Sequence, residues 1–124
     1  TYGLERLCMF TQGKKNVFDL EWNNDGILYR DVFHQSEKEF SKYNFELANT
    51  DNLFKIFDMI EKESKSLIEN KLSLPAYDQC LKASHIFNIL DARGVISVAQ
   101  RAEYIGRIRD LSKDVGQIWL ESQK

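Results

Sequence analysis

The sequence lacks most of the features that would place a protein in a functional class at once. Its 124 residues include one proline, six glycines and two cysteines. It has no secretory leader pattern and no apolar run of the roughly 18 residues that a membrane span needs. The net charge is −2, so contact with nucleic acid would need a local basic patch. These absences favour a single soluble domain with a modest core, and they exclude a membrane span.

Motifs for catalysis and metal binding are equally scarce. Cys8 and Cys80 have no CxxC partner and no histidine at ligand spacing, so we expect two reduced, buried thiols. His34 and His85 lie far apart in the sequence, and His85 falls on a buried type of helix, which indicates a core histidine. No Gly-x-Ser-x-Gly stretch, Cys/His dyad or metal-ligand cluster is present. We therefore expect no metal bound by the protein itself.

Hydrophobic spacing predicts a mainly all-α chain, a bundle of about five helices. A short helix should run from Leu4 to Gly13, and a possible two-stranded ribbon lies near residues 17–29, although its first half could also be a helical turn. Capping patterns place the later helix starts at Ser36, at Thr50 or Asp51, near Leu74 with Pro75 in the first turn, and at Ser97. Gly94 should end the fourth helix.

The third expected helix is amphipathic, with an apolar stripe that includes Leu53, Phe57 and Ile60. Its solvent-facing side should carry Glu61, Lys62, Glu63 and Lys65.

The last two expected helices carry polar residues on their apolar sides. Asn88 and Asp91 line up on one helix, and Arg101 and Arg109 lie on the inner side of the next. A short connection makes these helices antiparallel, and buried charges must find partners. We therefore predict a cluster of Asp91, Arg101 and Asn88 with Arg93 nearby. It would be either a polar clamp that fixes helix register or the wall of a binding site, and Asp91→Ala should cost about 3 kcal/mol if the pair is buried.

The opening residues, TYGLER, suggest a second site. Gly3 permits close approach of a ligand to the backbone, and Arg6 lies in the first turn of a helix, where free amides favour anions. A guanidinium there suits phosphate oxygens, with Glu5 beside it to hold an amine or to orient Arg6. The alternative is a surface Glu–Arg pair on an ordinary helix.

Six stretches together resemble one family: TYGLERLCMFTQG, VFDLEW, DVFHQSE, YNFE, LPAY and LDARGVISVAQR. In this order they are similar to the α subunit of bacterial tetrameric glycyl-tRNA synthetase, a class II aminoacyl-tRNA synthetase. TYGLER resembles motif 3 of that class, whose Glu-Arg follows the last strand of the catalytic sheet. Since the chain opens on Thr1 rather than on methionine, we expect a C-terminal piece of the α+β subunit, with motifs 1 and 2 upstream.

The resemblance implies roles for individual residues. Arg6 matches the catalytic arginine that contacts ATP, Gly3 matches a glycine near the adenylate, and Thr1 and Glu5 lie where neighbours line the ATP and glycine pocket. Residues 1–33 would be the edge of the catalytic domain, and residues 34–124 a C-terminal helical domain. Arg101, Arg107 and Arg109 of that domain are possible tRNA contacts.

The resemblance also implies the reaction and its partners. The intact enzyme would be cytoplasmic, would use ATP and Mg²⁺ to activate glycine, and would transfer it to tRNA(Gly) as an α2β2 heterotetramer with a β subunit. It would have no membrane or DNA partner. We expect the 124-residue chain to be inactive alone. The alternatives are a non-catalytic helical module that binds tRNA or protein, and a generic helical bundle with a fortuitous Gly-Leu-Glu-Arg.

Overall fold

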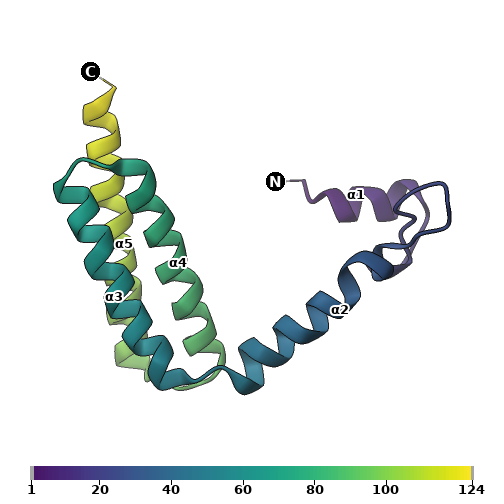
Figure 1. The fold of residues 1–124 in the computed structure, drawn as a ribbon, viewed down its shortest axis with the longest axis horizontal. Helices are drawn as coiled ribbons and strands as arrows, with labels where there is room; N and C mark the ends of the chain where they lie inside the picture. Colours follow the sequence, from purple (N-terminus) through teal and green to yellow (C-terminus); the bar gives the residue numbers. More distant parts are fainter. Residues whose placement is uncertain (1, 124) are drawn as a thin grey trace. The chain divides into compact units, whose positions relative to one another are not determined.

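The computed structural model describes residues 2–123, and its regular structure is helical (Figure 1). The α-helices are α1 (Leu4–Thr11), α2 (Tyr29–Lys42), α3 (Thr50–Glu69), α4 (Ser73–Ala92) and α5 (Val98–Ser122). This confirms the expected all-α class with about five helices. No helix in the described part of the chain is long and apolar enough to cross a membrane.

The chain forms two compact units, Thr1–Asn44 and Phe45–Lys124. They meet in the sequence at a π-helical turn, Tyr43–Leu47, which directly follows α2. The boundary expected after residue 33 falls inside α2. The assignment of a catalytic role to the first part and a supporting role to the second stays a prediction.

In the first unit, a single antiparallel bridge replaces the expected two-stranded ribbon. Glu21 and Leu28 form this bridge, and two backbone hydrogen bonds of 2.8 Å flank it. The preceding residues, Val17–Asp19, form a 3-10 helix. The Asn16 side chain caps this turn by accepting a hydrogen bond from the Phe18 N–H at 2.9 Å. The first half of the expected ribbon is therefore a helical turn, which was the alternative that the sequence left open.

Helix α2 begins earlier than the predicted cap at Ser36. It starts at Tyr29, because the Asp31 carboxylate accepts a hydrogen bond from the Leu28 N–H at 2.8 Å. Ser36 lies in the middle of the helix, where backbone N–H groups already donate to carbonyls one turn earlier. The prediction that the Ser-x-x-Glu pattern marks a helix start is therefore wrong.

The second unit is a bundle in which α4 packs against both α3 and α5, with fewer contacts between α3 and α5. The α3 cap is Asn49, one residue before Thr50 and two before Asp51, the two caps that the sequence predicts. The α5 cap is Ser97, as predicted, and Gln100 completes a reciprocal capping box with it.

The two connections of the bundle are tight turns that use left-handed backbone. Gly94 follows α4 with φ 66°, as predicted for the residue that ends this helix. The α3–α4 turn instead places Lys71 at φ 60°, which is the only positive φ of a non-glycine residue in the described part of the chain.

The bundle core is made of two sets of buried side chains. The first joins α3 to the end of α4 and contains Ala48, Leu53, Ile89 and Leu90. The second lies among all three helices and contains Phe57, Ala83, Phe87 and Tyr104. Ser64 is also fully buried, and its Oγ donates to the Ala76 carbonyl at 3.1 Å. This bond satisfies the hydroxyl where the small Ala76 lets α3 and α4 approach closely.

Glu61 is a correction to the expected solvent-facing side of α3. Its neighbours Lys62, Glu63 and Lys65 are exposed, but Glu61 is only 8% exposed. The Arg107 guanidinium of α5 donates to Glu61 Oε2 at 2.5 and 3.2 Å, and to Asp58 at 2.6 Å. A buried carboxylate needs such a partner, because its desolvation is otherwise too costly.

We predict that Glu61→Gln lowers the free energy of unfolding by about 2 kcal/mol at neutral pH, because it leaves Arg107 half-buried without its main counter-charge. Urea unfolding followed by Trp119 fluorescence in a Trp22→Phe background measures this loss in the helical unit. Glu63→Gln on the exposed face is the matched control, with an expected change below about 0.5 kcal/mol. Equal losses for the two variants would show that Glu61 carries no special interaction.

The same pair should make the helical unit sensitive to acid. The hydrogen bond from Arg107 holds the pKa of Glu61 below its ordinary value. The stabilisation is therefore complete above the unfolded pKa, about 4.3, and is lost as the pH falls through the lower folded pKa. We expect the stability difference between the natural chain and Glu61→Gln to shrink below about pH 4. A difference that stays constant through that range would contradict this account.

Candidate functional site

The first candidate site lies at the start of α1. Gly3 precedes the helix with φ 74° and ψ 96°, a conformation that side chains larger than hydrogen rarely adopt. Arg6 lies in the first turn with its side chain exposed. The N–H groups of a first turn have no acceptors within the helix, and the helix dipole adds positive potential there. The backbone and the guanidinium thus favour an anion at the same end of α1.

An open cavity of about 590 Å³ lies beside this turn. Gly3, Glu5 and Arg6 line it, together with Tyr2, Met9 and Val17. The structure therefore brings together three of the four residues predicted for the ATP and glycine pocket. The fourth, Thr1, lies outside the described residues.

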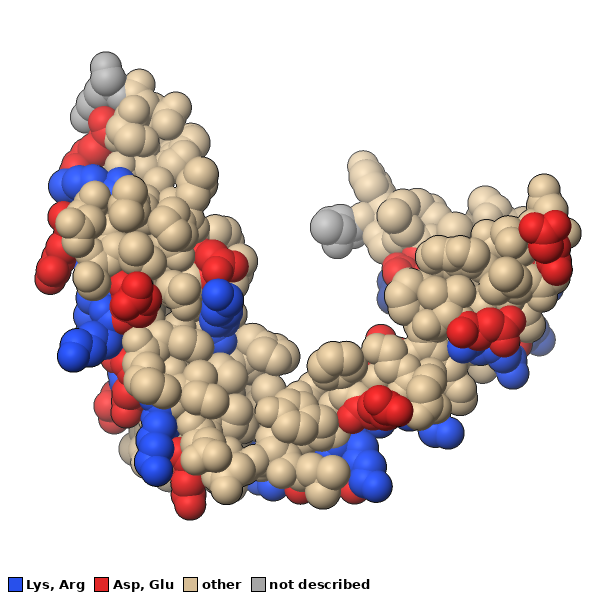
Figure 2. All heavy atoms as spheres, viewed as in Figure 1, with Lys and Arg blue, Asp and Glu red and all other residues tan. Residues whose placement is uncertain are grey.

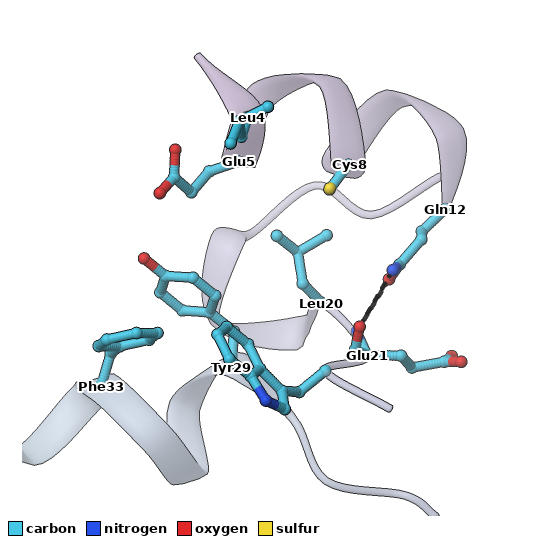
Figure 3. A pocket seen from close by; sticks show the side chains of 9 residues that line it. Leu4, Glu5, Cys8, Gln12, Leu20, Glu21, Tyr29 and Phe33 are labelled. Atoms are coloured by element: carbon cyan, nitrogen blue, oxygen red, sulfur yellow. Dashed lines mark hydrogen bonds between the residues drawn. The ribbon is translucent and has the colours of Figure 1, made fainter. Parts of the chain in front are cut away.

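A second cavity of about 320 Å³ lies between α1 and the start of α2 (Figure 3). Its walls are largely apolar and aromatic, with Leu20 between the two sides and Trp22, Tyr29 and Phe33 along one of them. The Tyr29 and Phe33 rings lie 4.7 Å apart between centroids, and the Trp22 and Phe33 rings 5.4 Å apart. Glu5 lines this cavity as well as the first one, so the two cavities share one carboxylate residue.

Two hydrogen bonds hold the far end of α1 against this second cavity. The Gln12 side chain accepts from the Glu21 N–H at 2.8 Å and donates to the Glu21 carbonyl at 3.1 Å. Lys14 also pairs with the Glu21 carboxylate at 3.1 Å. The α1 helix is therefore held at its C-terminal end by these bonds, while Arg6 in its first turn is exposed.

Carboxylates give the second cavity a negative character. Partial burial raises the pKa of Tyr29, and the carboxylates of Glu5 and Glu37 raise it further. In Figure 3 the Tyr29 hydroxyl and the Glu5 carboxylate lie on the same side of the cavity. Carboxylates beside aromatic rings suit an amine or another cation, whereas Arg6 in the first cavity suits phosphate.

The expectation of two buried thiols is half correct. Cys80 is buried on α4, and burial raises its pKa, but Cys8 is exposed on α1. His85 is likewise exposed, so the prediction of a core histidine is wrong. His85 lies on the outer side of α4. The sequence does not indicate this side, because apolar residues are spread around the whole of that helix.

The second candidate site is the polar cluster predicted in the helical unit. Arg101 and Asp91 do pair, and Arg101 Nε lies 3.2 Å from both carboxylate oxygens. The prediction of burial is wrong, because these side chains are 54% and 33% exposed. Asn88 is exposed and makes no hydrogen bond to this pair within residues 2–123. Arg93 turns away and donates to the Ala48 carbonyl at 2.8 Å.

The least exposed arginine of α5 is Arg107, not Arg101 or Arg109. Its guanidinium lies 4.6 Å from the centre of the Phe57 ring and 4.9 Å from that of Tyr104. Arg109 is exposed and has no ion pair among residues 2–123. The sequence reading missed Glu61 as the partner, although an acid that faces the apolar stripe of α3 could have signalled it.

We predict that Asp91→Ala costs less than about 1 kcal/mol, because the ion pair is largely exposed. Urea unfolding of the 124-residue chain measures this change, and Asp110→Ala, an exposed acid on α5, serves as the control. A loss near the 3 kcal/mol expected for a buried pair would contradict the geometry.

One comparison with known proteins bears on these sites. A family model described as glycyl-tRNA synthetase alpha subunit matches residues 1–124, which is the whole chain. The match agrees with the resemblance carried by TYGLER at the start of α1 and by LDARGVISVAQR across the α4–α5 turn. The chain therefore belongs to the glycyl-tRNA synthetase alpha subunit family.

Proposed function

We propose that the first unit forms one edge of the ATP and glycine pocket of a glycine–tRNA ligase, with Arg6 holding the triphosphate. The observation that carries this proposal is the exposed Arg6 guanidinium in the first turn of α1, beside a cavity of about 590 Å³. Its planar fork can donate two parallel hydrogen bonds to phosphate oxygens. Gly3 supports the same role because it leaves the backbone open to a ligand.

The family supplies the reaction in which this edge would take part. Glycine attacks the α-phosphate of ATP to give glycyl-adenylate and pyrophosphate, and the glycyl group then passes to the terminal ribose of tRNA(Gly). Arg6 would stabilise the charge on the phosphates. Glu5 lies close enough to line the same cavity and could bind the glycine ammonium. Thr1 would also line this pocket.

Magnesium is expected to accompany ATP in this family. In the described part of the chain, no group of three or more His, Cys, Asp or Glu side chains could hold a metal ion. Mg²⁺ is usually held by one or two carboxylates together with phosphate oxygens and water, so we assign neither a ligand nor a step to the metal here.

We further propose that the helical unit supports the catalytic part and contacts tRNA or the β subunit of a cytoplasmic α2β2 enzyme. Arg107 is committed to Glu61 and Asp58, and Arg101 is paired with Asp91. Arg109 is thus the best remaining candidate among the three predicted tRNA contacts, because it is exposed and without an ion pair in residues 2–123.

The test of the Arg6 proposal is Arg6→Gln in the complete α and β enzyme. We expect glycine-dependent ATP–pyrophosphate exchange to fall about 100-fold, because the change removes a charge-assisted contact to phosphate. Lys15→Gln is the matched control, since it removes an exposed cation of the same unit that lines neither cavity. Exchange that survives Arg6→Gln at the control level would refute the assignment.

The 124-residue chain alone should show no such exchange, because one pocket edge cannot position both ATP and glycine. Robust exchange from the isolated chain would overturn this expectation.

The alternative function is a non-catalytic interaction module. It predicts that the isolated chain binds tRNA and that this binding weakens steeply with added salt.

A further inference from the structure

A shallow apolar groove lies between the start of α4 and the end of α5. Its volume is about 340 Å³, and it is lined by Leu74 and Tyr77 from α4 and by Ser112, Gly116 and Trp119 from α5, among others. Leu74 is 73% exposed, and Tyr77 and Trp119 are each nearly half exposed. Figure 2 shows an area nearly free of charged side chains at this end of the bundle. Apolar side chains that are exposed side by side can form a binding surface.

The α5 side of the groove is lined by small residues. A Cβ built on Gly116 would meet nothing within 4 Å, and Ser112 lies one helical turn earlier. With no bulky side chains at these positions, a second helix could approach the α5 backbone closely. Trp119 stands one turn further along and provides a large apolar side chain against which such a helix could pack.

The charges around the groove are uneven. Arg109 and Lys113 each precede a groove residue by three positions, so they lie along its α5 edge. Neither has an ion pair among the described residues. The acids of the same helix stretch, Asp110 and Asp114, fall on the other side by the same spacing. The groove therefore has a basic edge, although the chain as a whole is acidic.

The α4 edge contributes no net charge. Asp78 and Lys82 pair with each other at 2.8 Å on the outer side of this helix. At the end of the groove, Lys71 pairs with Glu121 at 3.1 Å. The positive potential at the groove thus comes from Arg109 and Lys113.

We propose that this groove binds an amphipathic helix of a partner protein, with its apolar face between α4 and α5 and its acidic flank against Arg109 and Lys113. Laying an apolar helix face into a groove is a common mode of peptide recognition. The mainly apolar lining favours a protein helix over RNA. Tyr77 and Trp119 could also stack on bases, so RNA binding is one of the outcomes tested below. This inference does not depend on Arg6 or on the catalytic proposal. It rests on the proposal that the helical unit binds a partner, and it assigns Arg109 to a protein partner instead of to tRNA.

The probe is a labelled, designed amphipathic helix of about 18 residues, five turns, with leucine on one face and glutamate on the other. Fluorescence polarisation with the full 124-residue chain measures its binding. We expect it to bind at least about tenfold more tightly than the same peptide with lysine in place of glutamate, because two exposed ion pairs replace two repulsions. Added salt should reduce this preference.

Charge reversal on the chain gives the decisive comparison. Arg109→Glu with Lys113→Glu should invert the preference, so that the lysine peptide binds more tightly. Lys55→Glu with Lys62→Glu, on exposed positions of α3, changes the net charge equally and should leave the preference intact. Circular dichroism confirms that each variant is folded. Failure of both peptides to bind, equal binding of both, or an equal effect of the two double variants would overturn the proposal.

Two further readouts separate the competing occupants of the groove. Trp119→Ala should weaken the glutamate peptide by about tenfold or more, because it removes the largest apolar contact. In sedimentation experiments, the chain alone should not self-associate through this groove. Self-association through the groove would be recognised by its loss in the Arg109→Glu and Lys113→Glu double variant. Such self-association would assign the groove to a second copy, and competition by a single-stranded RNA oligonucleotide would assign it to RNA; either result contradicts the proposal.

Discussion

The ion pair between Arg107 and Glu61 is the constraint on which the helical unit depends. It joins α5 to α3, two helices that otherwise touch less than either touches α4. The guanidinium also lies against the Phe57 and Tyr104 rings, so charge, hydrogen bonding and ring packing meet at one side chain. A shift of α5 along its axis would separate all of these contacts together, and the buried carboxylate would lose its partner. The pair therefore sets the register of the bundle as well as part of its stability.

The sequence predicted the helical class and the presence of paired charges better than it predicted where they lie. The need for an arginine of the last helix to find an acid was inferred correctly, but the helical wheel pointed to Arg101. That choice rested on an apolar stripe that runs from Val98 to Trp119, and both of these residues proved exposed. Glu61 stands among charged neighbours, although its spacing from Phe57 and Ser64 places it on the apolar side of α3. Only the packing of α5 identifies Arg107 as the partner that accompanies its burial. Local patterns report the spacing of side chains, whereas burial depends on which helix lies opposite.

The candidate site shows the same division. Gly3 and Arg6 could be singled out because a left-handed residue and a basic first turn are local features. The two cavities could not, because their walls join α1 to residues of the 3-10 turn and of α2 through contacts that no spacing encodes. The sequence also does not show that Glu5 lines both cavities, the one beside Arg6 and the aromatic one beside Tyr29. Family membership then gives these local features a chemical meaning that geometry alone does not supply.

The proposed function depends above all on Arg6 lying at the edge of a nucleotide pocket. The most direct measurement is an experimental structure of the complete enzyme, α and β subunits together, with ATP bound. We expect the Arg6 guanidinium to lie within hydrogen-bond distance, about 2.7–3.2 Å, of an ATP phosphate oxygen. A structure in which ATP is bound while Arg6 points to solvent, or pairs only with protein groups, would contradict it.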